Sequence, residues 1–248
     1  MSFELYRKCS LKKAMVFAFI FLALHGIVMQ RFIHAEGQTR FRQTFFDSVA
    51  PIKMKDPLAV LLGAINKDDV FVFTYADAVK FAGHSCPAVA GAYKSTQIAL
   101  KNLYGEDVPV RGNIQVALEG GTDTKVNGPV SHIVTLITGA APESGFKGFG
   151  EKGIHGRYNL MTFDLGKSLN PTATCSMIFQ RIDNGKIVKI TYFADNVPMD
   201  KRAGKLMPLV ISGKASGEEV SLFGDLMQER VKTILLNPPE GTFVVSRQ

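Results

Sequence analysis

The segment from residue 81 to residue 104 contains the residue types and spacing best suited to chemistry. Its sequence, FAGHSCPAVAGAYKSTQIALKNLY, places His84 two positions before Cys86 and follows the cysteine with Pro87. Imidazole nitrogen and thiolate sulfur are both good zinc ligands. Proline suits the first position of a helix, and the unpaired amides and aligned peptide dipoles of a helix N-terminus favour a thiolate. The pattern predicts a metal-binding or thiol-reactive site at a helix N-terminus.

A metal site needs more than these two donors, and several other side chains could supply them. Glu119 ends a predicted strand, Asp123 follows in a Gly-Gly-Thr-Asp loop, His132 lies on a predicted helix, His155 lies in a glycine-rich loop, and Cys175 lies on a later strand. Glu119 and His132 rank highest because their elements should pack on the turn that carries the histidine. We therefore predict a divalent transition metal such as zinc, or a metal-containing cofactor such as haem, held by His84, Cys86, Glu119 and His132.

The same two residues allow two other functions. Cys86 could be a nucleophile with His84 as its base, which would make the protein a thiol-dependent enzyme. Once the N-terminal leader described below has been removed, Cys86 and Cys175 are the two cysteines left, and in an oxidising compartment they could form a disulfide. That bond would indicate a non-catalytic interaction domain.

A glycine-rich segment forms a second candidate site. Residues 148–153, GFGEKG, satisfy the pattern G-x-G-x-x-G. A dinucleotide site needs a strand before this pattern and a helix after it, whereas the segment that follows is predicted to be a strand. We instead expect a loop that binds an anion, such as a carboxylate or the propionates of a haem. The predicted cofactor-binding residues are Lys147, Lys152, His155 and Arg157.

The N-terminus of the chain has the pattern of an export signal. Four basic residues precede an apolar run that begins at Ala14, and Ala35 offers a cleavage site. We predict that residues 1–35 are a signal peptide or an N-terminal membrane anchor, that this is the only membrane-associated segment, and that the protein is exported to the periplasm. This leader carries five basic residues and one acid out of a net charge of +7, so the remainder is only mildly basic. A nucleic-acid partner is therefore not expected.

The pattern of apolar residues predicts an α+β fold. Helices are expected at 57–66, 88–103 and 125–139, and strands at 112–119, 156–165, 173–181 and 187–193, whereas 70–82 fits either type. Two further helices are expected between 200 and 237, followed by a short strand. This order predicts a helix-strand-helix-strands core with a mixed sheet and helices packed on one face, plus C-terminal helices. The sequence leaves the oligomeric state open.

Residues 83–87 (Gly-His-Ser-Cys-Pro), with the later Thr138-Gly139 turn and the segment 156–160 (GRYNL), resemble the FmdE-like family, which is named after a component of formylmethanofuran dehydrogenase. The resemblance covers residues 70–195 and implies a mixed sheet with a metal near the His-x-Cys turn. It divides the chain into an N-terminal extension at 36–69, the family domain at 70–195 and a C-terminal helical extension at 196–248. The sequence departs from the family at Ala140, where members typically have a second cysteine.

Overall fold

The computed structural model describes residues 39–167 and 169–247, and residues 43–248 form one compact unit. The predicted leader at 1–35 lies outside the described residues. Within the described part of the chain, no helix is long and apolar enough to span a membrane.

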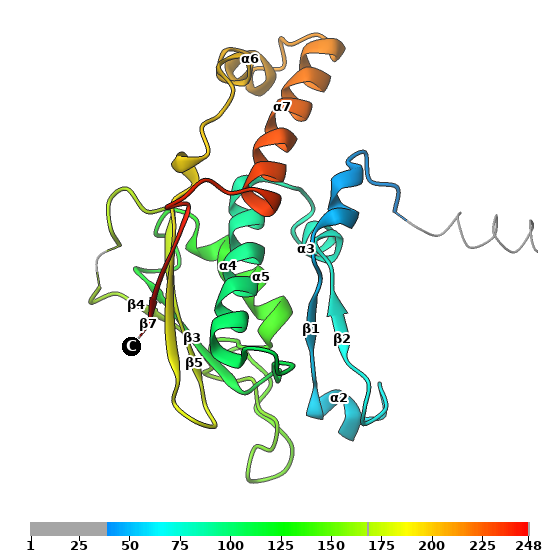
Figure 1. Ribbon diagram of the computed structural model, residues 1–248, viewed down its shortest axis with the longest axis vertical. Helices are drawn as coiled ribbons and strands as arrows, with labels where there is room; N and C mark the ends of the chain where they lie inside the picture. The colour runs from blue at the N-terminus through cyan, green and yellow to red at the C-terminus, as the bar shows by residue number, and fades with distance from the viewer. Residues whose placement is uncertain (1–38, 168, 248) are drawn as a thin grey trace, which may run out of the picture. The chain divides into compact units, whose positions relative to one another are not determined.

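A five-stranded mixed sheet forms one layer of the unit (Figure 1). The strand order is β4-β3-β5-β6-β7, and every neighbouring pair is antiparallel except β3 and β4. Side chains alternate between the two faces, so that Ile114, Val116 and Leu118 of β3 are buried on one face while Gln115 is exposed on the other. The strands are β3 (Ile114–Glu119), β4 (Met161–Asp164), β5 (Cys175–Arg181), β6 (Ile187–Tyr192) and β7 (Phe243–Arg247).

Two helices, α4 (Pro87–Tyr104) and α5 (Asn127–Thr138), pack against each other and against the sheet, α4 on β6 and α5 on β3. α5 joins the parallel strands β3 and β4, as a crossover helix does. Both helices bury long apolar stripes, including Val89, Leu103 and Ile133. The predicted α+β class is therefore confirmed, and α4, β3, α5 and the β5–β6 hairpin lie within two residues of their predicted bounds.

The N-terminal part of the unit adds a small second sheet. β1 (Ile52–Met54) pairs with β2 (Phe71–Phe73), and η1 (Thr44–Ser48) packs on α3 (Tyr75–Ala82). The buried hydroxyl of Tyr93 on α4 donates to the carbonyl oxygens of Ala50 and Phe73, which fixes this sheet to the helical layer. The ambiguous segment 70–82 thus holds both element types, because Thr74 caps a new helix directly after the strand.

The C-terminal segment returns to the sheet after two helices. α6 (Lys201–Ile211) packs on α7 (Gly217–Leu236), and α7 packs on α4. β7 then pairs with β6 as the fifth strand. Residues 196–248 therefore belong to the same compact unit as the preceding residues and complete its sheet.

Two predicted elements are shorter than expected. The helix predicted at 57–66 ends at Leu61 (α2, Pro57–Leu61), because Gly63 adopts a left-handed conformation with φ of 72°. The strand predicted at 156–165 begins only at Met161. The amides of Arg157 and Tyr158 instead donate to Phe146, and Asn159 has a positive φ of 55°. These residues close a loop rather than extend the sheet.

Candidate functional site

The His-x-Cys segment joins the end of α3 to the start of α4. Gly83 ends α3 in the left-handed conformation, with φ of 74°, where a side chain would be strained. Cys86 is the N-cap of α4 and has extended backbone, with φ of −145° and ψ of 169°, and Pro87 is the first helical residue. The predicted helix N-terminus is therefore present.

His84 and Cys86 form a hydrogen-bonded pair. The Nε2 atom of His84 lies 3.2 Å from the Sγ atom of Cys86, and its Nδ1 atom lies 2.9 Å from the carbonyl oxygen of Ala82. A carbonyl oxygen only accepts, so Nδ1 carries the proton and Nε2 presents its lone pair to the thiol. The extended backbone at the N-cap lets residues two apart face each other. His84 is exposed and Cys86 is half-buried, so solvent reaches the pair.

Ser85, between the two, anchors this segment to the rest of the protein. Its hydroxyl donates to Gln228 Oε1 at 2.9 Å and therefore accepts the Tyr75 hydroxyl at 2.9 Å, while Gln228 Nε2 donates to the Ser85 carbonyl oxygen at 2.9 Å. Burial raises the pKa of Tyr75 well above its ordinary value, the Ser85 hydrogen bond lowers it in part, and the nearby Cys86 thiol raises it further. The tyrosine therefore stays a neutral donor, and α3 and α7 both hold the turn in place.

Tyr192 supports the first turn of α4 from the sheet. Its hydroxyl donates to the Pro87 carbonyl oxygen at 3.0 Å, and its ring stacks on Phe243 with centroids 4.9 Å apart. α4 approaches so closely that a Cβ atom on Gly91 would lie 2.1 Å from the ring of Tyr192. Glycine is therefore required at position 91 for the helix to lie against the tyrosine.

The first turn of α4 also offers hydrogen-bond donors beside the thiol. Cys86 makes no side-chain capping bond. Among the described residues, the amide N–H groups of Ala88 and Val89 have no hydrogen-bond partner, and Pro87 has no N–H to offer. Two donors at a helix N-terminus suit a negative charge that develops next to the sulfur.

Cys175 has very different surroundings. It is fully buried on β5 directly opposite Tyr192, and burial raises the pKa of its thiol to about 12. Both cysteines are free thiols in the structure, so the disulfide alternative is not formed there.

The other predicted metal ligands do not join the pair. The Glu119 carboxylate pairs with the ammonium group of Lys189, 2.6 Å away on the sheet face opposite the helices, because the side chains of β3 alternate. His132 is exposed on α5 and packs edge-on against Phe81, with centroids 6.4 Å apart, and Asp123 is exposed in the loop after β3. Across residues 39–167 and 169–247, no three His, Cys, Asp or Glu side chains come together as a metal-binding group.

Ala140, the position at which FmdE-like proteins typically have a second cysteine, lies far from Cys86. Gly112 donates to the Thr138 carbonyl oxygen, which places the end of α5 beside the start of β3. Tyr192, which holds Pro87, ends β6, and β6 runs parallel to β3 through their shared neighbour β5. Cys86 and Ala140 therefore lie at opposite ends of the sheet, and Ala140 is fully buried.

The glycine-rich segment forms the tip of a surface loop. Phe149 and Ile154 pair as an antiparallel bridge, and the segment continues as loop rather than helix. Lys147 and Lys152 are exposed, and the Lys147 ammonium lies 5.7 Å from the centre of the Tyr158 ring. Half-buried His155 has a positive φ of 57°.

Arg157, the fourth residue predicted for this loop, points into the protein instead. Its side chain is buried and lies 2.7 Å from Asp56, which also binds Arg111 at 2.9 Å. A Cβ atom on Gly112 would lie only 2.0 Å from the Arg157 guanidinium group. This ion-pair cluster gives Arg157 a structural role, because it ties the loop to the start of α2.

Comparisons with known proteins give no relative for this chain: no family model, curated protein or solved structure matches it. The resemblance to the FmdE-like family stays a prediction.

The structure adds residues that sequence reasoning missed. Tyr75, Ser85 and Gln228 hold the His84–Cys86 turn, and the Ala82 carbonyl orients the imidazole. The serine could have been considered because it lies between the histidine and the cysteine. Nothing in the sequence indicates the contact of Gln228 with Ser85, since the two residues are 143 positions apart.

Proposed function

We propose that the protein is a thiol-dependent enzyme in which Cys86 is the nucleophile and His84 is its base. The observation that carries this proposal is the 3.2 Å separation of His84 Nε2 and Cys86 Sγ, with Nδ1 bound to the Ala82 carbonyl oxygen. A nucleophile, a base within hydrogen-bond reach and a third group that orients the base are the parts that covalent catalysis needs.

Each part has a chemical task in the attack on an electrophilic carbonyl carbon. His84 Nε2 takes the thiol proton while Cys86 Sγ forms a bond to that carbon. The resulting imidazolium keeps its Nδ1–H bond to the Ala82 carbonyl oxygen. The negative charge that develops on the carbonyl oxygen is stabilised by the N–H groups of Ala88 and Val89. The imidazolium then gives its Nε2 proton to the leaving group, which departs and leaves an acyl group on sulfur. The neutral imidazole next takes a proton from water as the water oxygen attacks the acyl carbon, and returns that proton to sulfur as the acid is released.

Cleavage of a chromogenic ester tests this proposal. With p-nitrophenyl acetate, the protein should release a rapid burst of p-nitrophenolate equal to the protein concentration, because acetyl transfer to sulfur precedes slower hydrolysis. Cys86→Ala should abolish the burst, whereas Cys175→Ser should keep it. Mass spectrometry should locate the acetyl group on Cys86. A full burst in the Cys86→Ala variant would exclude the proposal.

A second candidate function is metal binding by the same pair. The specific observation in its favour is the Ala82 carbonyl on Nδ1, since metal-bound imidazoles generally donate their other N–H to such a group. The imidazole and thiol donors fit zinc, and the remaining positions would be filled by water or by a cofactor that brings its own ligands. Elemental analysis of the wild type, His84→Gln and Cys86→Ser should then show metal in the wild type alone. Equal metal content in all three proteins would remove this candidate.

A further inference from the structure

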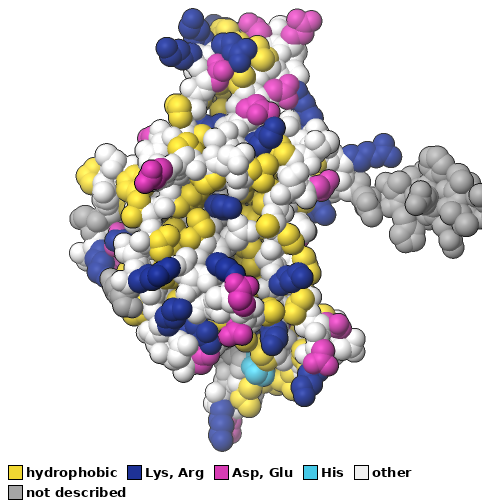
Figure 2. Space-filling model, viewed as in Figure 1, with side chains coloured by type: hydrophobic (Ala, Val, Ile, Leu, Met, Phe, Trp, Pro, Cys, Tyr) yellow, Lys and Arg dark blue, Asp and Glu magenta, His cyan; other side chains and the backbone are white. Residues whose placement is uncertain are grey.

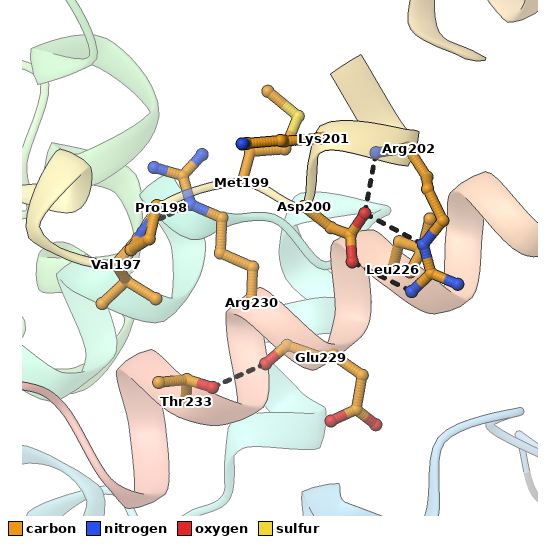
Figure 3. Close-up of a pocket in the computed structure, with 10 residues that line it drawn as sticks. All are labelled: Val197, Pro198, Met199, Asp200, Lys201, Arg202, Leu226, Glu229, Arg230 and Thr233. Atoms are coloured by element: carbon orange, nitrogen blue, oxygen red, sulfur yellow. Dashed lines mark hydrogen bonds and ion pairs between the residues drawn. The ribbon is translucent and has the colours of Figure 1, made fainter. Parts of the chain in front are cut away.

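A cavity of about 620 Å³ lies beside α7 (Figure 3), and neither His84 nor Cys86 lines it. Its walls come from residues 197–202, which lead into α6, and from one side of α7. Gln228, which holds the His84–Cys86 turn, points to the opposite side of the same helix from Leu226 and Arg230. The volume is in the range of small-molecule sites, and the cavity is open to solvent.

Part of the wall is apolar. Val197 and Leu226 are buried residues that line the cavity, and Met199 adds a flexible thioether side chain. These side chains offer an apolar surface that a short hydrocarbon group could cover.

Two of the charged residues that line the cavity neutralise each other. The Asp200 carboxylate accepts three hydrogen bonds from Arg202, two from its guanidinium group and one from its amide. Glu229 lies 3.8 Å from Lys232, one turn further along α7, and Figure 3 shows its carboxylate directed away from the upper end of the cavity. Neither the Asp200–Arg202 pair nor Glu229 is therefore placed to balance a cation at that end.

Lys201 and Arg230 bring two cationic side chains to that end. Figure 3 shows the ammonium group of Lys201 and the guanidinium group of Arg230 at the same end. Arg230 is held rigidly, since Nε donates to the Val197 carbonyl oxygen at 2.6 Å and one terminal nitrogen donates to the Ala194 carbonyl oxygen at 2.8 Å. The same terminal nitrogen also lies 3.4 Å from the exposed carboxylate of Asp195. Among the described residues, its other terminal nitrogen and Lys201 Nζ have no partner.

α6 also carries Lys205, and Figure 2 shows Lys and Arg side chains together with Asp and Glu side chains at the upper end of the view. A pre-oriented arginine beside a lysine is the arrangement that binds carboxylates and phosphates.

We propose that this cavity binds a small organic carboxylate, with its anionic group between Lys201 and Arg230 and its short apolar body against Val197, Met199 and Leu226. This inference is independent of the chemistry at Cys86. The ligand is a monoanion with a body of a few carbon atoms, because the lining combines these two cationic side chains with apolar ones.

Isothermal titration calorimetry with hexanoate tests the proposal directly. Hexanoate should bind the wild type, hexan-1-ol should bind at least about tenfold more weakly because it lacks the charge, and inorganic phosphate should compete with hexanoate. Lys201→Gln should weaken hexanoate at least about fivefold, and because Lys201 is exposed, the variant should fold normally. Arg230→Lys keeps the positive charge but loses the planar guanidinium group that can donate two parallel hydrogen bonds to a carboxylate, so hexanoate binding should also weaken.

Lys214→Gln is the matched control, because this lysine is exposed near the same helix pair but does not line the cavity. Its affinity for hexanoate should equal that of the wild type. Equal binding of hexanoate and hexan-1-ol, no hexanoate binding at about 10 mM, or an unchanged affinity in Lys201→Gln would each overturn the proposal. Phosphate binding without hexanoate binding would overturn the apolar part of it.

Discussion

Cys86 and Cys175 are the same residue type in two opposite environments, and Tyr192 lies between them. Cys86 caps the start of α4, half-buried, with an imidazole nitrogen 3.2 Å from its sulfur. Cys175 is fully buried within β5 directly opposite Tyr192, and the hydroxyl of that tyrosine holds the first residue of α4. Burial is the main cause of the raised pKa of Tyr192, and a negative charge on either thiol would raise that pKa further. The environment, rather than the side chain, decides which thiol can react.

The largest expected difference between the cysteines is in alkylation. With iodoacetamide at pH 7.5, Cys86 should be modified in the folded protein, whereas Cys175 should react at least about 10⁴-fold more slowly. A thiol whose pKa is about 12 is almost entirely protonated at that pH, and no reagent reaches it until the chain unfolds. Peptide mapping after timed labelling measures both rates, and guanidinium chloride should make the two rates similar. Rapid labelling of Cys175 in the folded protein would contradict the comparison.

Gly91→Ala tests the support that Tyr192 gives to α4. The added methyl group would lie 2.1 Å from a ring held by Pro87 and Phe243, so we expect a loss of about 2 kcal/mol in the free energy of unfolding. Urea unfolding measures it. Gly204→Ala is the control, because it lies within α6 with no atom near the new Cβ, and it should stabilise the protein by up to about 1 kcal/mol. Equal effects of both substitutions would mean that Tyr192 does not constrain the helix.

Cys175 should also make stability depend on pH. Its thiol loses a proton near pH 9 in the unfolded chain but only near pH 12 in the folded protein. The unfolded state therefore binds fewer protons within this window, and the free energy of unfolding falls as the pH rises through it, by up to about 1.4 kcal/mol per pH unit. Between pH 8 and pH 10, the wild type should lose about 1.4 kcal/mol more than Cys175→Ala. Identical losses in urea titrations would show that Cys175 does not titrate differently in the two states.

Gln228→Leu should have the smallest effect and should act only on the Cys86 side. It removes the two hydrogen bonds between Gln228 and Ser85 and leaves the one from Tyr75, at a cost of about 1 kcal/mol in unfolding free energy, and should slow Cys86 alkylation roughly threefold because the turn loosens. Gln97→Leu is the control: it also removes a hydrogen bond to a carbonyl oxygen, that of Ala50, so it should change stability without changing the alkylation rate. Equal Cys86 alkylation rates in the two variants would mean that the hydrogen bonds between Gln228 and Ser85 do not affect the reactivity of Cys86.

The two environments also show how far sequence could predict this structure. Pro87 after Cys86 and the glycine stops at positions 83 and 139 are local signals, so the helix N-terminus and both helix ends were predictable. Strand alternation could also have placed Glu119 on the sheet face away from His84. The contacts of Gln228 with Ser85 and of Arg157 with Asp56 were not predictable, since they join residues more than 100 positions apart. Such pairs depend on tertiary packing, which leaves no local pattern.

If His84 activates Cys86, the alkylation rate of Cys86 at pH 7 must depend on the imidazole. We compare the wild type with His84→Gln, in which a neutral amide replaces the base, and with His132→Gln, which removes an exposed histidine that packs on Phe81. We expect His84→Gln to slow the alkylation of Cys86 at least about tenfold and His132→Gln to leave the rate unchanged. Equal rates in the wild type and His84→Gln would contradict it.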